Sequence, residues 1–382
     1  MARKVREILV ANPRSERFAG GLRVVAQVNG EDLWFESDSA EIAASPEAFA
    51  TALLVPALHA DAQLVVDAPL DPLWRENVEQ ICRQFHEWWN YSSRAPLVAT
   101  TRTSGELSPS AATVQCFSGG CDSFYSLLCG GHDSTALLLV HGFDIPDFDS
   151  KRFSHARRSA ETVAAAVGKR LIAVRTNLRR HSAFRLATWE RTHGGALAAV
   201  GHLLVPQFGR LIIPSSYTYA DPTPWGSHWM VDKFWSSSGM AIQYDDATLY
   251  RLDKLKQMAS EPLVRNHLRV CYEEPVLQGN CSRCDKCVRT MLQLEILGEL
   301  ANYPVFDRDT PLVEILDSIP DVGPYLPHRF RQLIAEGLAP DLAAAVERLL
   351  ARQPSPRSAW WRRLKSKVHR HWHRGWVVRR AP

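Results

Sequence analysis

The chain has 382 residues, of which 46% are hydrophobic; at roughly 150 residues per domain this allows two or three domains with sizeable cores and excludes disorder over most of the length. Lys and Arg number 45 against 41 Asp and Glu. Residues 352–382 hold ten of the cations and no acid, which leaves 35 minus 41, a charge of −6, for the rest. The slight excess of positive charge therefore comes from the C-terminal segment alone.

Hydropathy predicts no membrane-spanning segment. The apolar run near the N-terminus is only four residues long, too short for the core of a secretory signal. The longest mostly apolar stretch, Gly194–Phe208, is interrupted by His202 and is shorter than the roughly 20 residues that a bilayer requires. We therefore expect a soluble, cytoplasmic protein.

Residues 1–110 are expected to form a small α+β module of their own. Leu22–Glu36 alternates apolar and polar residues around an Asn29-Gly30 turn, which is a hairpin signal. Helical periodicity follows in two segments, Pro46–Leu58 and Trp74–Trp89. A polar linker, Thr100–Ser110, closes the module.

Residues 111–300 alternate short apolar runs with helical patterns, which predicts an α/β domain with a Rossmann-like parallel sheet. The predicted strands are Thr113–Phe117, Thr135–His141, Leu171–Thr176, Arg210–Pro214 and Met240–Tyr244. The predicted helices between them are Asp122–Cys129, Arg152–Val167 and Glu190–Leu204. Residues 301–351 are expected to form small helices around prolines, ahead of a basic tail at 352–382.

A glycine-rich turn joins the first of these strands to its helix. It has the sequence Phe117-Ser118-Gly119-Gly120-Cys121-Asp122-Ser123. Two glycines allow a close approach of an anion to the backbone, and the helix start supplies N–H donors and a positive dipole. An acid in a phosphate cradle would repel the ligand, so Asp122 fits a Mg²⁺ ligand better than a phosphate contact. The alternative is an ordinary turn in which Asp122 caps the helix.

This turn resembles the S-G-G-x-D-S fingerprint of the PP-loop ATP pyrophosphatase superfamily. The resemblance implies that Ser118, Gly119, Gly120, Cys121, Asp122 and Ser123 bind the β and γ phosphates of ATP. A substrate oxygen would then attack the α phosphate, giving an adenylate and pyrophosphate, with catalytic roles for Ser118, Asp122 and Ser123. Cys121 occupies the variable position and is either a small core residue or a reactive thiol.

Four of the eight cysteines are close together in the sequence, at Cys271, Cys281, Cys284 and Cys287. Two-residue gaps let neighbouring sulfurs converge on one ion, and four thiolates can complete a tetrahedral zinc site. The same number could hold an iron–sulfur cluster. We prefer Zn²⁺; structural cysteines without a metal are the remaining alternative.

The loop and the cysteines together are most similar to the 7-cyano-7-deazaguanine synthase family. The similarity continues through Leu252-Asp253-Lys254, Leu263-Val264-Arg265-Asn266 and the residues around Cys271. In that family a lysine of this segment lies near the nucleotide phosphates, which implies the same role for Lys254; the alternative is a surface lysine. The match covers residues 112–295 and leaves residues 1–110 and 352–382 without a counterpart.

Several further residues are candidates for the nucleotide pocket and the substrate pocket. The carboxyl ends of the second and third strands offer His141 and Gly142, and Arg175 and Thr176. His193, at a helix start, could contact the α phosphate or be a surface histidine. Aromatic and polar residues between Ser215 and Ser238 suit a flat ring or an aromatic minicore: Tyr217, Tyr219, Trp225, His228, Trp229, Asp232 and Trp235.

The sequence thus predicts an ATP-dependent ligase that uses ATP, Mg²⁺ and Zn²⁺. It would adenylate a carboxylate or carbonyl oxygen of a small molecule, for which the resemblance implies a deazapurine-like ring, for attack by ammonia or another nucleophile. One alternative is a tRNA thiolation enzyme of the PP-loop type with an iron–sulfur cluster. A second alternative is a nucleotide-binding protein without catalysis.

The basic tail has apolar residues at every fourth position. They are Trp360, Leu364, Val368, Trp372 and Trp376. On a helix this spacing gives an apolar stripe flanked by cations, typical of an interfacial helix on an anionic membrane. RNA binding and a disordered basic tail are the alternatives.

Overall fold

The computed structural model describes residues 6–18, 20–102, 110–221, 223–271, 273, 279–307, 309–320 and 327–352. The chain divides into two compact units, Met1–Tyr272 and Glu273–Pro382. The predicted tail helix falls outside the described residues.

The first unit is an α/β structure around one ten-stranded sheet, whose strand order is β10-β9-β6-β7-β8-β3-β2-β1-β4-β5. The five strands predicted beyond residue 111 are all present. They are β6 (Thr113–Cys116), β7 (Ser134–His141), β8 (Arg170–Thr176), β9 (Arg210–Ile213) and β10 (Ala241–Tyr244). Each pairs with its neighbour in parallel, as expected for strands joined through helices.

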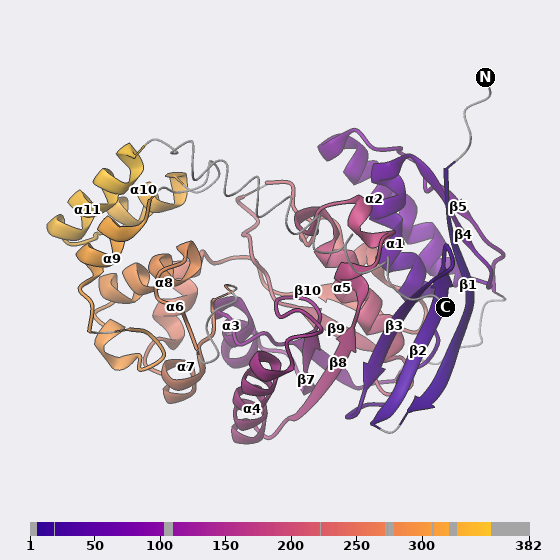
Figure 1. The fold of residues 1–382 in the computed structure, drawn as a ribbon, viewed down its shortest axis with the longest axis horizontal. Helices are drawn as coiled ribbons and strands as arrows, with labels where there is room; N and C mark the ends of the chain where they lie inside the picture. The colour runs from indigo at the N-terminus through magenta and orange to yellow at the C-terminus, as the bar shows by residue number, and fades with distance from the viewer. Residues whose placement is uncertain are drawn as a thin grey trace, which may run out of the picture. The chain divides into compact units, whose positions relative to one another are not determined.

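Helices cover both faces of this parallel part of the sheet. Two connecting helices, α3 (Cys121–Cys129) and α4 (Ser150–Ala166), follow β6 and β7. The third, α5 (Trp189–Leu203), lies on the face opposite α4, where it packs against α1 (Pro46–Ala60) (Figure 1). The predicted Rossmann-like α/β architecture is therefore confirmed for this part of the chain.

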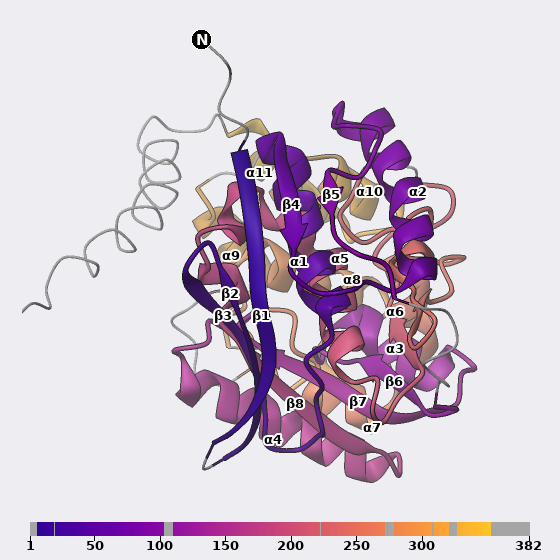
Figure 2. The same ribbon diagram turned by 90° about the vertical axis from the view of Figure 1, so that its right-hand side faces the viewer.

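The N-terminal residues do not form a module of their own. The predicted hairpin is present as β2 (Gly21–Val28) and β3 (Glu31–Ser37), with Asn29 and Gly30 at positive φ in its turn. β3 then pairs antiparallel with β8 through Phe35 and Thr176, so the hairpin continues the same sheet, as the second view shows (Figure 2).

Three further N-terminal strands complete the sheet. They are β1 (Arg6–Phe18), β4 (Ala62–Val66) and β5 (Leu97–Val98). β1 is antiparallel to β2 and parallel to β4, and β4 is parallel to β5. The predicted second helix is α2 (Pro72–Trp89), which begins after an Asp71 cap that accepts from the Trp74 N–H at 3.0 Å.

The core explains why the expected boundary near residue 110 is not a boundary. Buried side chains of the N-terminal strands and of α1 belong to one hydrophobic cluster with those of β6–β9 and α5, including Phe35, Phe49, Val174 and Val200. Gly195 of α5 faces the Thr51 carbonyl of α1, where an added Cβ would lie 3.0 Å from that oxygen. The two helices therefore approach at a small residue, and neither buries its apolar face without the other.

The short helices α6 (Arg251–Met258) and α7 (Pro262–His267) complete the first unit. The second unit is helical in its described residues, with α8 (Asp285–Ile296), α9 (Leu312–Ser318), α10 (Pro327–Ala335) and α11 (Pro340–Ala351). Its buried side chains include Tyr303, Leu316, Phe330 and Leu349. The prediction of small helices in residues 301–351 is confirmed.

Candidate functional site

The glycine-rich turn lies where the order of the parallel strands reverses. In chain order the five parallel strands occupy positions 5-4-1-2-3, because β9 and β10 lie on one side of β6 while β7 and β8 lie on the other. Open α/β sheets bind ligands at the carboxyl ends of the two strands that flank such a point. Here those ends are followed by Phe117–Gly120 after β6 and by Pro214–Ser215 after β9.

The turn is a tight connection between β6 and the first turn of α3. Gly119 has φ +77°, a conformation that favours glycine, and Gly120 precedes the first turn of α3. The Gly120 N–H donates to Ser118 Oγ at 3.3 Å, and the Ser123 hydroxyl donates to Gly120 O at 2.9 Å. The two serines thus brace the loop from inside.

Cys121 points into the protein. Its side chain is buried, and burial raises the pKa of its thiol to about 12. A thiol with that pKa is protonated at neutral pH, so the geometry favours the core residue over the reactive thiol.

Asp122 is held by two cations of α6. Its carboxylate lies 3.2 Å from the guanidinium of Arg251 and 3.5 Å from Lys254 Nζ. Burial lowers the pKa of Arg251, and the nearby carboxylate of Asp122 raises it, with a net rise. One acidic and two basic groups therefore converge at the start of α3.

Lys254 also joins the two loops at the switch point. It is only 2% exposed, and its Nζ donates to Ser215 O at 2.5 Å and to Ser215 Oγ at 2.9 Å. The alternative that Lys254 is a surface lysine is wrong. The oxygen partners of this buried ammonium come from α3 and from the segment that follows β9.

Two arginines of this site were missed in the sequence. Arg251 lies three residues before Lys254, so both fall on one face of α6, and this spacing could have revealed it. Arg269 donates from its backbone N–H to Gly119 O at 2.7 Å and from its guanidinium to Ser118 O at 3.0 Å. No local pattern marks Arg269, because its partners precede it by about 150 residues.

The candidates at the ends of β7 and β8 serve the sheet itself. His141 is buried, stacks on Phe153 with ring centroids 4.1 Å apart and lies 2.8 Å from Pro146 O. Burial lowers its pKa, so it is neutral near pH 7. Gly142 has φ +114° and approaches Thr176 O so closely that a Cβ there would clash. These contacts give His141 and Gly142 packing roles.

Arg175 and Thr176 lie at the joint between β8 and the N-terminal hairpin. The Thr176 hydroxyl donates to Trp34 O at 2.7 Å. The Arg175 guanidinium lies 3.4 Å from the buried carboxylate of Glu36 and 5.3 Å from the Trp34 ring centroid. Both side chains therefore hold β3 against β8.

Two of the aromatic residues predicted to line a substrate pocket, Tyr217 and Trp225, lie in one row of rings with Trp189 and His193 of α5. His193 of α5 lies between Trp189 and Trp225, at ring-centroid distances of 5.8 and 5.5 Å, and Trp225 contacts Tyr217 at 5.7 Å. All four are partly buried. Trp229 contacts Tyr219 and His228, whereas Trp235 is fully buried.

Asp232 is a buried acid within the same segment. The Ser227 hydroxyl donates to Oδ2 at 2.5 Å, and the His228 N–H donates to Oδ1 at 3.1 Å. Burial nevertheless raises the pKa of Asp232 to about 7. Burial removes the carboxylate from water and so disfavours its charged form, and this effect exceeds that of the two hydrogen bonds.

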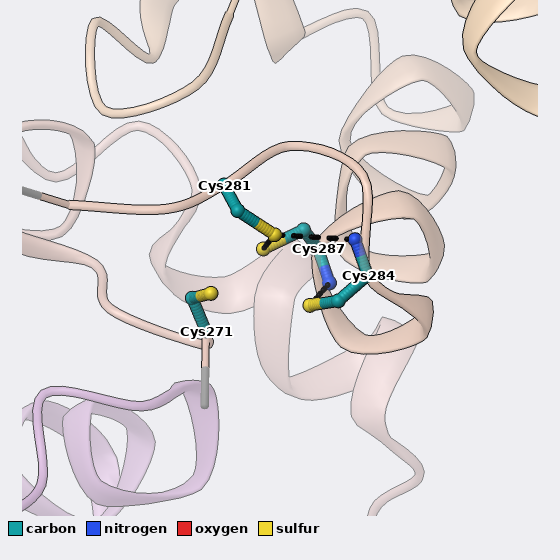
Figure 3. Close-up of side chains that lie close together, drawn as sticks. All are labelled: Cys271, Cys281, Cys284 and Cys287. Atoms are coloured by element: carbon teal, nitrogen blue, oxygen red, sulfur yellow. Dashed lines mark hydrogen bonds between the residues drawn. The ribbon is translucent and has the colours of Figure 1, made fainter. Parts of the chain in front are cut away.

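The four predicted cysteines converge on one point (Figure 3). The sulfurs of Cys271, Cys281, Cys284 and Cys287 all lie within 4.8 Å of one another. The Cys284 N–H donates to Cys281 Sγ at 3.2 Å, and the Cys287 N–H donates to Cys284 Sγ at 3.5 Å. Backbone donors of this kind stabilise thiolates, so the cluster can hold a metal ion such as zinc.

The local chain geometry brings the last three cysteines together. Gly279 and Ser282 both have positive φ, which turns the chain tightly before α8. The Asp307 N–H donates to Ser282 Oγ at 2.8 Å, and Asn280 Nδ2 donates to Val305 O at 3.3 Å. Cys284 is the cap of α8, so Cys287 lies on its first turn.

Comparisons with known proteins give little further information. No protein-family profile and no curated protein matches the chain. A search of solved structures found the structure of a type III CRISPR defence DNA nuclease activated by cyclic oligoadenylate, with 13% identity and a TM-score of 0.22. The alignment covers 82% of this chain and 54% of that one, and a likeness this low carries no argument. Among the described residues, no helix has the length and apolarity needed to cross a bilayer.

Proposed function

We propose that this protein is an ATP-dependent adenylating enzyme of the PP-loop type, which forms AMP and pyrophosphate. The observation that carries the proposal is the placement of the Ser-Gly-Gly-Cys-Asp-Ser turn at the switch point of the sheet, with Arg251, Lys254 and Arg269 around it. A glycine-rich turn alone is a weak signal. A turn with three basic residues around it, at the usual ligand-binding edge, is a stronger one.

The residues of the loop would bind the phosphates through backbone N–H groups and the Ser118 and Ser123 hydroxyls. Lys254 and Arg251 would offset the negative charge that develops on the leaving pyrophosphate. Each now pairs with Asp122, so the carboxylate keeps both cations in place before the nucleotide enters. Asp122 is also the residue that would hold Mg²⁺, which supplies further charge neutralisation when bound.

The substrate would be a small molecule with a carboxylate or carbonyl oxygen. A deazapurine-like ring is supported only by the resemblance to the 7-cyano-7-deazaguanine synthase family. The row from Trp189 to Tyr217 offers partly buried ring faces. A planar ring could stack on such a surface. Ammonia or another nucleophile would then displace AMP from the adenylate.

The four cysteines would bind Zn²⁺ in a structural role. Four protein thiolates complete a tetrahedral shell and leave no open position for a substrate. A brown, iron-containing protein from anaerobic preparation would instead support a PP-loop tRNA thiolation enzyme with an iron–sulfur cluster. Metal analysis together with the visible absorbance spectrum separates the two.

The main test measures the products of ATP. The full-length protein is incubated with Mg²⁺, ammonium and ATP labelled at the α or γ phosphate, together with a panel of carboxylates that includes a deazapurine carboxylate. We expect labelled AMP and pyrophosphate, and a loss of at least a hundredfold in rate for Asp122→Asn and Ser118→Ala. ADP and phosphate as products would contradict attack at the α phosphate.

Asp253→Asn is the matched control, because Asp253 is an exposed acid beside Lys254 on the same helix. Its activity should equal that of the wild type. If the protein binds ATP but forms no AMP with any carboxylate of the panel, the result would favour a nucleotide-binding protein without catalysis.

A further inference from the structure

Two consecutive carbonyl groups of the glycine-rich turn point at one residue. Ser118 O accepts from the Arg269 guanidinium at 3.0 Å, and Gly119 O accepts from the Arg269 backbone N–H at 2.7 Å. Arg269 lies beyond α7, in the segment that leads to Cys271. A single residue therefore holds the backbone of the turn from one side.

The direction of these carbonyls fixes the direction of the N–H groups. In a trans peptide the C=O and the following N–H point in opposite directions. Because Ser118 O and Gly119 O face Arg269, the N–H groups of Gly119 and Gly120 face away from it, and the Gly120 N–H faces Ser118 Oγ. Successive N–H groups on one side of a turn form a concave anion-binding nest.

The segment that carries Arg269 is itself anchored on both sides. Leu268 and Val270 are buried, whereas Arg269 between them is only partly buried. Cys271 follows directly and belongs to the four-cysteine cluster. A metal ion bound there would fix Cys271, and Arg269 lies two residues before it in the chain.

We infer that Arg269 is a positioning residue for the anion-binding turn, and that it links this turn to metal binding at the four-cysteine cluster. This inference rests on the proposed function, because it takes the ligand of the turn to be a phosphate group. Arg269 orients the N–H donors of Gly119 and Gly120. Metal at the cluster in turn holds Arg269 in place.

The first test measures binding of inorganic pyrophosphate and of ATP, each with Mg²⁺, to the full-length protein by calorimetry. Arg269→Met keeps an unbranched side chain of similar bulk to the apolar part of arginine and removes the donor to Ser118 O, while Arg269→Lys keeps a charged donor. We expect roughly tenfold weaker binding for the Met variant, because it loses the charged hydrogen bond that orients the turn. The Lys variant should retain most of the affinity.

Arg158→Met is the matched control, because Arg158 is an exposed arginine of α4. It should bind both ligands as the wild type does. Rescue by Lys separates positioning from general destabilisation, because loss of the fold would not depend on which side chain replaces Arg269. Equal affinity of the Met variant and the wild type would overturn the role of Arg269.

The second test measures the link to the metal site without any ligand. Zinc-loaded protein is mixed with a chromophoric chelator, and the rate of zinc release is followed for the same four proteins. We expect release at least threefold faster from the Met variant than from the wild type, the Lys variant and the Arg158→Met control. Equal rates in all four would overturn the link to the metal site.

Failure of the proposed function gives a different result. A folded, zinc-loaded wild type that binds neither pyrophosphate nor ATP would overturn both the function and the role of Arg269. A wild type that binds both ligands, beside a Met variant that binds them equally well, would overturn only the role of Arg269.

Discussion

Lys254 Nζ lies 3.5 Å from the Asp122 carboxylate although the two residues are 132 positions apart. The same ammonium contacts Ser215, which follows β9. One buried cation thus joins the ends of β6 and β9 at the switch point of the sheet.

Lys254→Met should weaken the binding of Mg-ATP at least tenfold. The change removes a buried positive charge beside the turn. Asp122 then pairs with Arg251 only. A charged hydrogen bond contributes about 1.5–3 kcal/mol. Titration calorimetry measures the change, with Lys256→Met, an exposed lysine of the same helix, as the control. Equal affinities for the two variants would show that Lys254 plays no part in nucleotide binding.

Replacement of any one of the four clustered cysteines by Ser should release the metal and destabilise the protein. The free energy of metal binding also stabilises the folded state, because the unfolded chain lacks the preformed site; for structural zinc it is on the order of 10 kcal/mol. Metal content by elemental analysis and the thermal unfolding midpoint measure the two effects. Cys129→Ser is the control, because Cys129 is exposed and outside the cluster. Unchanged metal content in all four variants would show that the cluster is not a metal site.

Asp232→Asn should remove a pH dependence of stability. Burial raises the pKa of Asp232 from 3.8 to about 7, so between these values the folded protein binds a proton that the unfolded chain releases. The free energy of unfolding therefore falls as the pH rises from about 4 to 7. The full shift corresponds to about 4 kcal/mol as an upper bound.

The Asn variant should gain stability relative to the wild type between pH 5 and pH 8, because its amide does not titrate. Ser227 can donate to the amide oxygen or accept from its NH₂, so the local contacts survive. Denaturant unfolding at several pH values measures the difference. Parallel pH profiles for the two proteins would contradict a raised pKa at this position.

Gly194→Ala should destabilise the protein although alanine favours a helix interior by about 1 kcal/mol over glycine. Gly194 lies on α5, where an added Cβ would clash with the backbone of Gly226 and Ser227. Overpacking of this kind costs typically 1–3 kcal/mol, which exceeds the gain in helix propensity. Thermal unfolding checks the sign. Gly168→Ala is the control for an alanine added without a clash, because Gly168 lies at an exposed turn with open space around it. Any loss of stability in this control comes from the φ of +67°, which disfavours alanine.

The alternating part of the fold could be predicted because its signals are local. Each of the five strands beyond residue 111 is a short apolar run, and β6 differs from its predicted range by one residue. The four cysteines were predictable for the same reason, since three of them lie within seven residues. The Asn29-Gly30 turn likewise fixed the β2–β3 hairpin.

What sequence reasoning missed depends on contacts between distant residues. β1 carries mixed polar residues because much of one face is exposed, so it lacks a clear apolar pattern. The pairing of Phe35 with Thr176 has no local signal at all. Arg269 was missed in the same way, because only the folded chain brings it to Ser118.

The joint between β3 and β8 also sets an order of events during synthesis. The Thr176 hydroxyl and Trp34 O are 142 positions apart in the chain. At about 5–20 residues per second, the ribosome needs roughly 7–30 s to make that length. Until then the edge of β3 has no partner strand, and unpaired edges readily join other chains. During that interval the newly made N-terminal hairpin carries an unpaired edge that a chaperone could protect.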